Sequence, residues 1–207
     1  FPYTTLFRSP EGLKTIPTYM FLDCKSLKEI KIPESVTKIG SQAFEYCHSL
    51  TELIIPANVD TIETAAFSGC TSLESIYVDP KNTVFSSVNG LLCNADGTAI
   101  ICAPAGISGH VVIPEGVRVI EEGAFSNCIY MEEVTIPNSV EQIKDVAFCQ
   151  SESLAKIHMG KGVKDIGRQA FDFTAHYNDP KNRENGLLYI DDCLVGFHTD
   201  ERDVFIK

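Results

Sequence analysis

The chain has 207 residues, a formal net charge of −11 and a pI of about 4.8. Proteins that bind nucleic acid or an anionic membrane surface need a basic stripe, which this sequence lacks, so both classes are excluded. Its hydrophobic content of 44% favours an ordered chain. The sequence also contains no run of about 18 apolar residues, the length that a membrane-spanning helix needs.

The first nine residues stand apart from everything that follows. Residues 1–9 match the in-frame translation of a widely used DNA sequencing adapter. We expect this segment to be a non-native scar and exclude it from the fold. The alternative is a native tail without fixed structure. If the scar interpretation is right, the natural start is missing, and a signal peptide cannot be expected in this sequence.

A repeated motif dominates the rest of the chain. The dipeptide Ala-Phe occurs five times, and Met20-Phe21 occupies the same place in a sixth copy. The phenylalanines are spaced by 23 residues within two groups and by 58 residues between the groups: Phe21, Phe44 and Phe67, then Phe125, Phe148 and Phe171. A fixed period of this size is typical of a solenoid, whose stacked units bury a core that no single unit could bury.

Each repeat predicts the same local structure. Apolar residues flank one outward residue in triplets such as Ile30-Lys31-Ile32, a period of two that indicates a short strand. A proline usually ends the strand, because proline cannot donate to a ladder. The segment Gln42–Cys47 contains good helix formers with Phe44 and Cys47 three residues apart, which predicts one helical turn. We therefore expect an α/β repeat solenoid of short parallel strands and short helical turns.

The extra residues between the two groups predict an insert. Two apolar runs surround the turn Asn94-Ala95-Asp96-Gly97, which indicates a β-hairpin. Asn-Gly-Leu-Leu recurs at 89–92 and 185–188, and Asp-Pro-Lys-Asn recurs at 79–82 and 179–182, where both copies suit turns. The expected layout is a scar at 1–9, a repeat block at 10–78, a hairpin insert at 79–112, a second block at 113–177, and a truncated second hairpin insert at 178–207. Val204–Lys207 resembles the start of another repeat.

Four of the eight cysteines occupy one repeat position, three residues after the phenylalanine: Cys24, Cys47, Cys70 and Cys128. In a parallel stack their Cβ atoms would lie about 4.8 Å apart. That distance exceeds the roughly 3.5–4.5 Å that a disulfide needs, so we interpret them as small buried side chains. Ser151 and Thr174 fill the same column in later repeats.

No set of residues predicts catalysis, a metal or a cofactor. The sequence has no nucleophile elbow, phosphate loop, HExxH or EF-hand loop, and no CxxC, so we expect neither an enzyme nor a zinc site. Asp96-Gly97 and Asp191-Asp192 could supply calcium ligands, but turns favour these residues too, and we prefer that interpretation. The histidines are scattered and are expected on the surface: His48, His110, His158, His176 and His198.

The most variable column of the repeats is the outward residue at the middle of each strand. Its members are Lys31, Ile54, Tyr77, Thr135 and His158, and a flanking column contains Glu29, Glu52 and Glu133, together with Ser75 and Lys156. Ile54 and Tyr77 are apolar on a face that should be wet, and adjacent exposed apolar groups can mark a contact site. We predict that these two columns form a binding strip. Alternatively, Ile54 and Tyr77 reflect strand propensity or lie beneath the insert that begins at Asp79.

The line Ile-Pro-x-x-Val-x-x-Ile-x-x-x-Ala-Phe-x-x-Cys-x-x-Leu, carried almost completely by residues 32–53, resembles the BspA-type leucine-rich repeat. The resemblance covers about residues 12 to 207 and implies a leucine-rich-repeat solenoid with hairpin inserts. Proteins of this family are typically secreted or on the cell surface. They are linked to adhesion, to binding of host matrix proteins and to contact between bacteria.

The leading functional hypothesis is a non-enzymatic binding module that recognises a protein or glycan through the strand face and the inserts. The alternative is a structural spacer that carries another domain outside this sequence and binds nothing itself.

Overall fold

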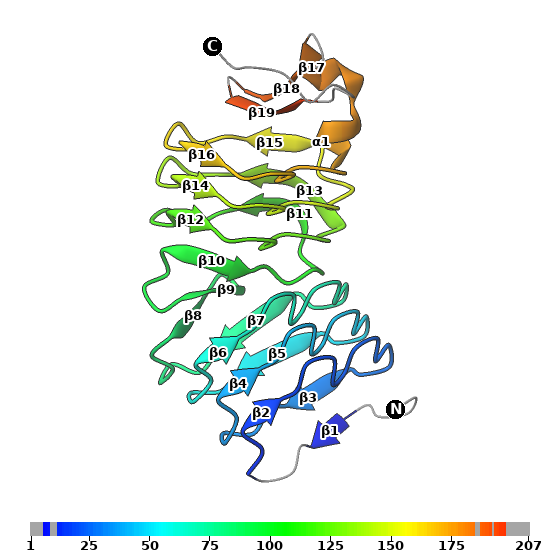
Figure 1. The fold of residues 1–207 in the computed structure, drawn as a ribbon, viewed down its shortest axis with the longest axis vertical. Helices are drawn as coiled ribbons and strands as arrows, with labels where there is room; N and C mark the ends of the chain where they lie inside the picture. Colours follow the sequence, from blue (N-terminus) through cyan, green and yellow to red (C-terminus); the bar gives the residue numbers. More distant parts are fainter. Residues whose placement is uncertain (1–5, 9–11, 185–186, 192, 198–207) are drawn as a thin grey trace.

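The computed structural model describes residues 6–8, 12–184, 187–191 and 193–197, which form one elongated stack (Figure 1). The strands of the lower part are β1 (Leu6–Arg8), β2 (Thr15–Ile16), β3 (Glu29–Lys31), β4 (Lys38–Ile39), β5 (Glu52–Ile55), β6 (Thr61–Ile62), β7 (Ser75–Val78), β8 (Phe85–Val88), β9 (Leu91–Asn94) and β10 (Ala99–Cys102). Above them lie β11 (Ser108–Val112), β12 (Val119–Ile120), β13 (Tyr130–Thr135), β14 (Gln142–Ile143), β15 (Lys156–His158), β16 (Asp165–Ile166), β17 (Arg183–Glu184), β18 (Leu187–Ile190) and β19 (Cys193–Phe197). Helix α1 (Ala175–Asn178) and a 3₁₀ turn at Pro180–Asn182 precede β17.

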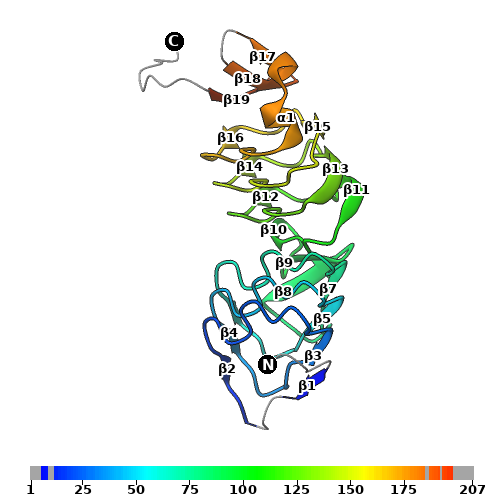
Figure 2. The same ribbon diagram turned by 90° about the vertical axis from the view of Figure 1, so that its right-hand side faces the viewer.

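The strands stack in two parallel rows, one per side of the solenoid, as Figures 1 and 2 show. One row contains β3, β5 and β7 in the first block (β2 to β7) and β11, β13 and β15 in the second block (β11 to β16). The other row contains the two-residue strands β2, β4 and β6, then β12, β14 and β16. Neighbouring strands are offset by one period, as where Glu52 pairs with Ser75 and Thr61 with Lys38. The predicted solenoid is confirmed.

The phenylalanines of the repeat form the predicted core columns. All six are at most 3% exposed. In the first block, Phe44 stacks on Phe21 and Phe67 with ring centroids 5.1 and 5.8 Å apart. In the second, Phe148 stacks on Phe125 and Phe171 at 4.9 and 5.1 Å. The core divides into two clusters, one per block, because no repeat phenylalanine bridges the insert.

The segment predicted as a helical turn has a different backbone. Residues 41–46 form consecutive turns closed by bonds such as Cys47 N–H to Phe44 O at 3.2 Å. Gln42 and Tyr46 have positive φ angles of 53° and 58°, which a right-handed helix does not allow. The alternate amides that these angles turn outward donate to the next turn of the stack, as Phe44 N–H does to Ala66 O at 2.8 Å. Stacking bonds thus replace helical bonds, and α1 is the only α-helix within the described residues.

The first insert is a three-stranded antiparallel unit of β8, β9 and β10. Asn89 and Gly90 connect β8 to β9 with φ angles of 53° and 79°, the backbone of a two-residue hairpin turn. The predicted hairpin around Asp96-Gly97 is confirmed as the β9–β10 connection. Strand β10 then pairs with β12, so the insert continues the second block's row of short strands.

Strand β9 separates the two cores. Leu92 is buried in the first block's core, whereas Leu91 and Cys93 are buried in the second's. Successive side chains of a strand point to opposite faces, which lets one strand serve both cores. The repeated Leu188 is likewise buried, on β18 of the antiparallel unit β17–β18–β19 near the C-terminal end.

The recurrent Asp-Pro-Lys-Asn segments adopt the same turn twice. Asp79 Oδ1 accepts from Lys81 N–H at 2.8 Å, and Asp179 Oδ1 accepts from Lys181 N–H at 2.9 Å. Both are structural turns, as predicted, because each carboxylate caps the amide two residues on.

Two of the expectations concern the ends of the chain, residues 1–9 and 204–207. Residues 1–9 were expected to lie outside the fold, but Leu6–Arg8 forms β1, which pairs in parallel with Glu29–Lys31 of β3 in the same one-period register as the repeats. The non-native origin of residues 1–9 stays a prediction. The expected start of another repeat at Val204–Lys207 lies outside the described residues.

Candidate functional site

The predicted binding residues all lie on the outward face of the long strands, but they form two groups. Ile54 and Tyr77 are direct neighbours on β5 and β7. Glu133 and Thr135 on β13 face Lys156 and His158 on β15. Lys31 and Glu29 on β3 and Glu52 on β5 are exposed. β7 and β11 are not paired, so the strip is divided at the insert.

The first group is an exposed apolar patch. Ile54 is 54% exposed and Tyr77 is 49% exposed. The insert docks on the edge of β7: Ile76 N–H donates to Gly90 O at 2.9 Å, and Ser87 Oγ donates to Ile76 O at 2.6 Å. Because the insert meets the strand edge, it leaves the faces of Ile54 and Tyr77 open to solvent.

Strand β11 adds two residues that the sequence analysis missed. Val112 pairs with Thr135 and is 58% exposed, so it belongs to the outward column between Tyr77 and Thr135. His110 pairs with Glu133 and belongs to the flanking column. Their signal was present in Val111-Val112-Ile113, which alternates like the other triplets and lies one period of 23 residues before Val134-Thr135-Ile136. These residues were missed because the expected layout assigned residues 79–112 to the hairpin insert, whereas Ser108–Val112 forms the first long strand of the second block.

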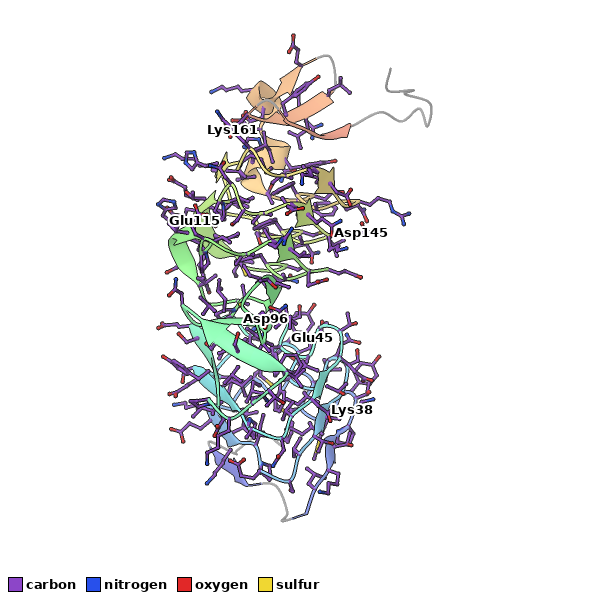
Figure 3. The ribbon with its side chains drawn as sticks, turned by 90° about the vertical axis from the view of Figure 1, so that its left-hand side faces the viewer. Lys38, Glu45, Asp96, Glu115, Asp145 and Lys161 are labelled. Atoms are coloured by element: carbon purple, nitrogen blue, oxygen red, sulfur yellow. The ribbon has the colours of Figure 1, made fainter. Side chains whose placement is uncertain are left out.

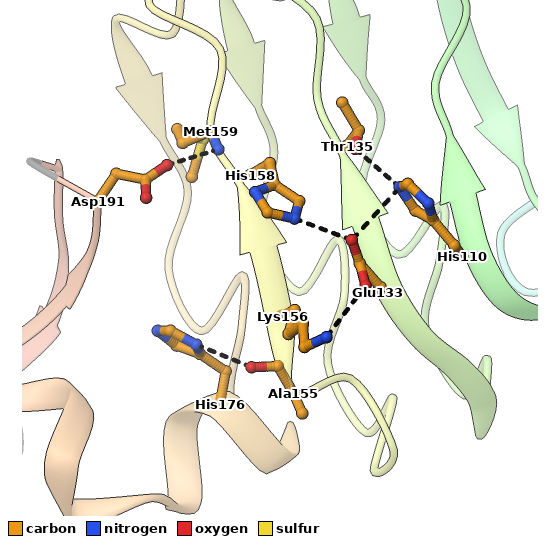
Figure 4. Close-up of polar contacts among 9 residues, drawn as sticks. All are labelled: His110, Glu133, Thr135, Ala155, Lys156, His158, Met159, His176 and Asp191. Atoms are coloured by element: carbon orange, nitrogen blue, oxygen red, sulfur yellow. Dashed lines mark hydrogen bonds and ion pairs between the residues drawn. The ribbon is translucent and has the colours of Figure 1, made fainter.

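The second group centres on Glu133, shown in Figure 4. His158 Nε2 lies 2.9 Å from Glu133 Oε1, and Lys156 Nζ lies 3.5 Å from Oε2. His110 Nε2 lies 3.8 Å from Oε1 and 2.8 Å from Thr135 Oγ1. Strands β11 and β15, on either side of β13 and each one period away in register, therefore direct three nitrogen-bearing side chains at the carboxylate of Glu133.

These contacts set the electrostatics of the second group. The hydrogen bond with His158 lowers the pKa of the Glu133 carboxyl, and the charges of His110 and Lys156 lower it further. The carboxylate is thus held in its charged form by neighbours on both sides of β13. The result is a polar patch beside the insert, with the apolar patch on the other side.

The chemistry of this face favours contact over reaction. Glu133 has its acceptor oxygens engaged by neighbouring donors, and no nucleophile lies among its partners. In the part of the chain that the structure describes, no group of three or more His, Cys, Asp or Glu side chains is arranged to hold a metal ion. Nor does any described helix combine the length and the apolar character needed to cross a membrane.

The buried cysteines of the described part of the chain are unreactive in the folded state. The seven whose side chains are described are free thiols. Of the four in the repeat column, Cys47, Cys70 and Cys128 are buried as expected, whereas Cys24, in the first repeat, is only partly buried. Burial raises the pKa of Cys93 to about 11 and that of Cys102 to about 12, so both remain protonated near neutral pH.

The fold and the repeated columns define a leucine-rich-repeat solenoid. The family model described as "BspA type Leucine rich repeat region" matches residues 3–90 and 108–192 in six copies, and the chain belongs to this family. No curated protein is significantly similar to the chain.

Several solved structures share the fold. A leucine-rich cell surface protein of Faecalibacterium prausnitzii A2-165 has 32% identity and a TM-score of 0.68 over 81% of this chain and 44% of its own. The T. pallidum leucine-rich repeat protein TpLRR has 26% identity and a TM-score of 0.53 over 84% of this chain and 77% of its own. The pneumococcal vaccine antigen PcpA, at 21% identity and a TM-score of 0.61 over 75% of this chain and 50% of its own, shows the fold alone. The chain thus spans less than half the length of the F. prausnitzii protein.

Proposed function

We propose that this chain is a non-enzymatic binding module of a cell-surface protein and that it recognises a protein or glycan through the outward face of its long strands. The observation that carries the proposal is the neighbouring pair Ile54 and Tyr77, each about half exposed on a strand whose other side chains alternate regularly into the core. Exposed apolar and aromatic neighbours are unfavourable in water unless a partner covers them.

The polar patch around Glu133 supports the same role. Glu133, His110 and His158 are held in place by one another, so a partner would meet them with little further loss of side-chain freedom. Together the two patches offer an apolar anchor and a polar rim, the arrangement that specific interfaces use. The F. prausnitzii relative, described as a cell surface protein, supports placing the module outside the cell.

A double variant tests the strand face. The purified chain is applied to a glycan array and to a panel of immobilised host matrix proteins, and each captured partner is then tested with Ile54→Ser plus Tyr77→Ser. We expect the variant to lose affinity by roughly tenfold or more, since truncating central apolar anchors costs at least about 1.4 kcal/mol.

The matched control is Tyr19→Ser plus Leu22→Ser, which removes similarly exposed apolar surface from the first turn of the solenoid, away from the strand face. If a captured partner binds wild type and the strand-face variant with equal affinity, this surface is not its binding site. A wild-type chain that captures nothing in either format would favour the spacer alternative.

A further inference from the structure

The junction between the two blocks contains a cleft, apart from the strand face. Its volume is about 560 Å³, within the range of roughly 300–1,000 Å³ that is usual for ligand sites. One wall is β6 with the turn at 65–68, and the other is formed by residues of β10 and the turn at 121–124. Along the long axis of the molecule in Figure 3, Asp96 of the β9–β10 connection lies between Lys38 of the first block and Asp145 of the second, at the level of this junction.

The cleft exists because one repeat phenylalanine is absent. Ala103 N–H donates to Ala124 O at 2.6 Å, as Phe44 N–H does to Ala66 O and Phe125 N–H to Ala147 O at the equivalent place of other turns. Ala103 thus holds the backbone position that a phenylalanine holds elsewhere, but its methyl group cannot fill the volume of a ring. Among the described rings, Phe44 therefore stacks on a phenylalanine on each side, whereas Phe67 stacks on Phe44 alone.

The wall formed by the first block is an open edge of the solenoid. In regular turns, three amides donate to carbonyls of the following turn; those of Val146, Phe148 and Gln150 reach Arg168, Ala170 and Asp172 at 2.9, 2.7 and 2.9 Å. The equivalent amides are those of Ala65 and Phe67, which line the cleft, and of Gly69, which follows the lining residue Ser68; they donate to no acceptor among the described residues. Strand β6 is likewise an edge strand, since β4 is its one partner among the strands that the structure describes.

Such an edge is completed by another backbone. In the regular turns, the carbonyls that accept from these amides belong to a segment of consecutive turns, in which Gln169 has a positive φ of 57°, so an incoming segment would adopt the same backbone. Completing an open backbone edge with another chain follows the same principle as strand addition. The rest of the lining is mostly apolar, with Ile62, Ile101 and Ala105 among its members. A free carboxylate ligand fits poorly, because Glu63, Glu121 and Glu122 also line the cleft.

The acidic side chains define the partner further. Glu63 is already paired with Lys38, its Oε1 lying 2.5 Å from Nζ. Glu121 and Glu122 form no ion pair within the described chain. Asp60, at the outer end of the β6 edge, is exposed as well. These charges complement a basic side chain on the incoming segment.

We propose that the cleft between the blocks binds a segment of a partner protein that adopts this turn backbone, whose carbonyls accept from Ala65, Phe67 and Gly69 and whose basic side chains face Glu121 and Glu122. The site does not depend on the strand-face function. It would give the module a second contact, recognising backbone and charge where the strand face recognises apolar surface.

The chain itself supplies a probe. Residues 164–172 (KDIGRQAFD) present carbonyls to the equivalent amides in the last turn of the second block and contain Lys164 and Arg168. The acetylated, amidated peptide of this sequence, with a fluorescent label, is titrated against the whole chain by anisotropy. Hydrogen exchange measured with and without peptide reports on the amides of residues 65–69.

Ala65→Trp tests the location. Ala65 is exposed in the cleft with a φ of 56°, so the indole would occupy the site without replacing a core residue. The matched control is Gln169→Trp, at the equivalent exposed position of the last turn, where φ is 57°. We expect Ala65→Trp to weaken peptide binding by roughly tenfold or more, and Gln169→Trp to leave it unchanged.

Charge is tested by a double-mutant cycle. Glu121→Gln plus Glu122→Gln should weaken binding of the probe, and that loss should vanish for the peptide with its Lys and Arg replaced by Gln. We also expect slower exchange at residues 65–69 when the peptide is bound. The proposal would be overturned if the peptide does not bind at millimolar concentration, or if it binds without protecting these amides. It would also be overturned if Gln169→Trp blocks binding and Ala65→Trp does not. Concentration-dependent self-association that protects the same amides would assign the edge to a second copy and also overturn it.

Discussion

Ser151 donates its side-chain hydroxyl to the carbonyl of Phe125, 26 residues earlier in the chain, at 2.7 Å. Two cysteines at the same repeat position make the same contact one turn back: Cys47 with Phe21 O at 3.1 Å and Cys70 with Phe44 O at 3.0 Å. The column was expected to need only a small side chain. This repeat position also favours a side chain that can donate a hydrogen bond, because the carbonyl of a phenylalanine is buried beneath it.

The stability of variants at position 151 should therefore depend on whether the new side chain can donate a hydrogen bond to Phe125 O. We expect Ser151→Ala to lower the free energy of unfolding by roughly 1 kcal/mol, because the side-chain bond is lost while Phe125 O keeps its backbone partner. Ser151→Cys should cost less, since cysteine occupies this place in other repeats. Urea denaturation followed by circular dichroism measures both. An alanine variant as stable as wild type would show that only size matters here.

The phenylalanine column should dominate stability. Phe148 is fully buried and stacks on both Phe125 and Phe171, so Phe148→Ala should cost about 3–5 kcal/mol. The control Lys161→Ala, at an exposed turn, should stay within about 0.5 kcal/mol of wild type. Equal, small effects in denaturant titrations of the two variants would contradict the stacked core.

The carboxyl of Glu133 should titrate below the usual range of an exposed glutamate, and His158 should be the largest cause. We expect His158→Ala to raise the Glu133 pKa more than Lys156→Ala does, as followed by the side-chain carboxyl ¹³C shift. Because the folded pKa is lowered, the contacts add stability above the unfolded pKa of glutamate. That contribution disappears as the pH falls through the folded pKa. A Glu133 pKa that neither variant moves would show that the cluster is not formed in solution.

Thiol labelling should follow burial. Iodoacetamide reacts with thiolates, and burial raises the pKa of Cys93 to about 11, of Cys102 to about 12, and of Cys128 as well. We expect the partly exposed Cys24 and Cys149 to be labelled first in the folded chain at pH 8, with the buried thiols reacting only in denaturant. Peptide mass spectrometry identifies the sites. Rapid labelling of Cys128 in the native protein would contradict the packing of its column.

The local periodicity of the sequence determined most of the fold. Apolar residues that recur every 23 positions can be buried only by stacking, so the solenoid, the phenylalanine columns and the outward strand residues were readable before any coordinates. The hairpin at Asp96-Gly97 was equally local, because its turn residues carry the signal. The helical turn at Gln42–Cys47 was predicted wrongly, because bonds between turns, which propensity does not contain, outweigh bonds within the turn.

Only the tertiary structure decided how the two blocks meet. The placement of β9 between two cores and the open amides of Ala65 and Phe67 both depend on how the insert joins the blocks. His110 and Val112 lie one period before Glu133 and Thr135, so their place in the strand face could have been predicted from the sequence. The insert breaks the period, so the sequence does not state which residues of the first block lie beside which residues of the second. That relationship is set by how the insert packs against both blocks, and so by contacts between residues far apart in the chain.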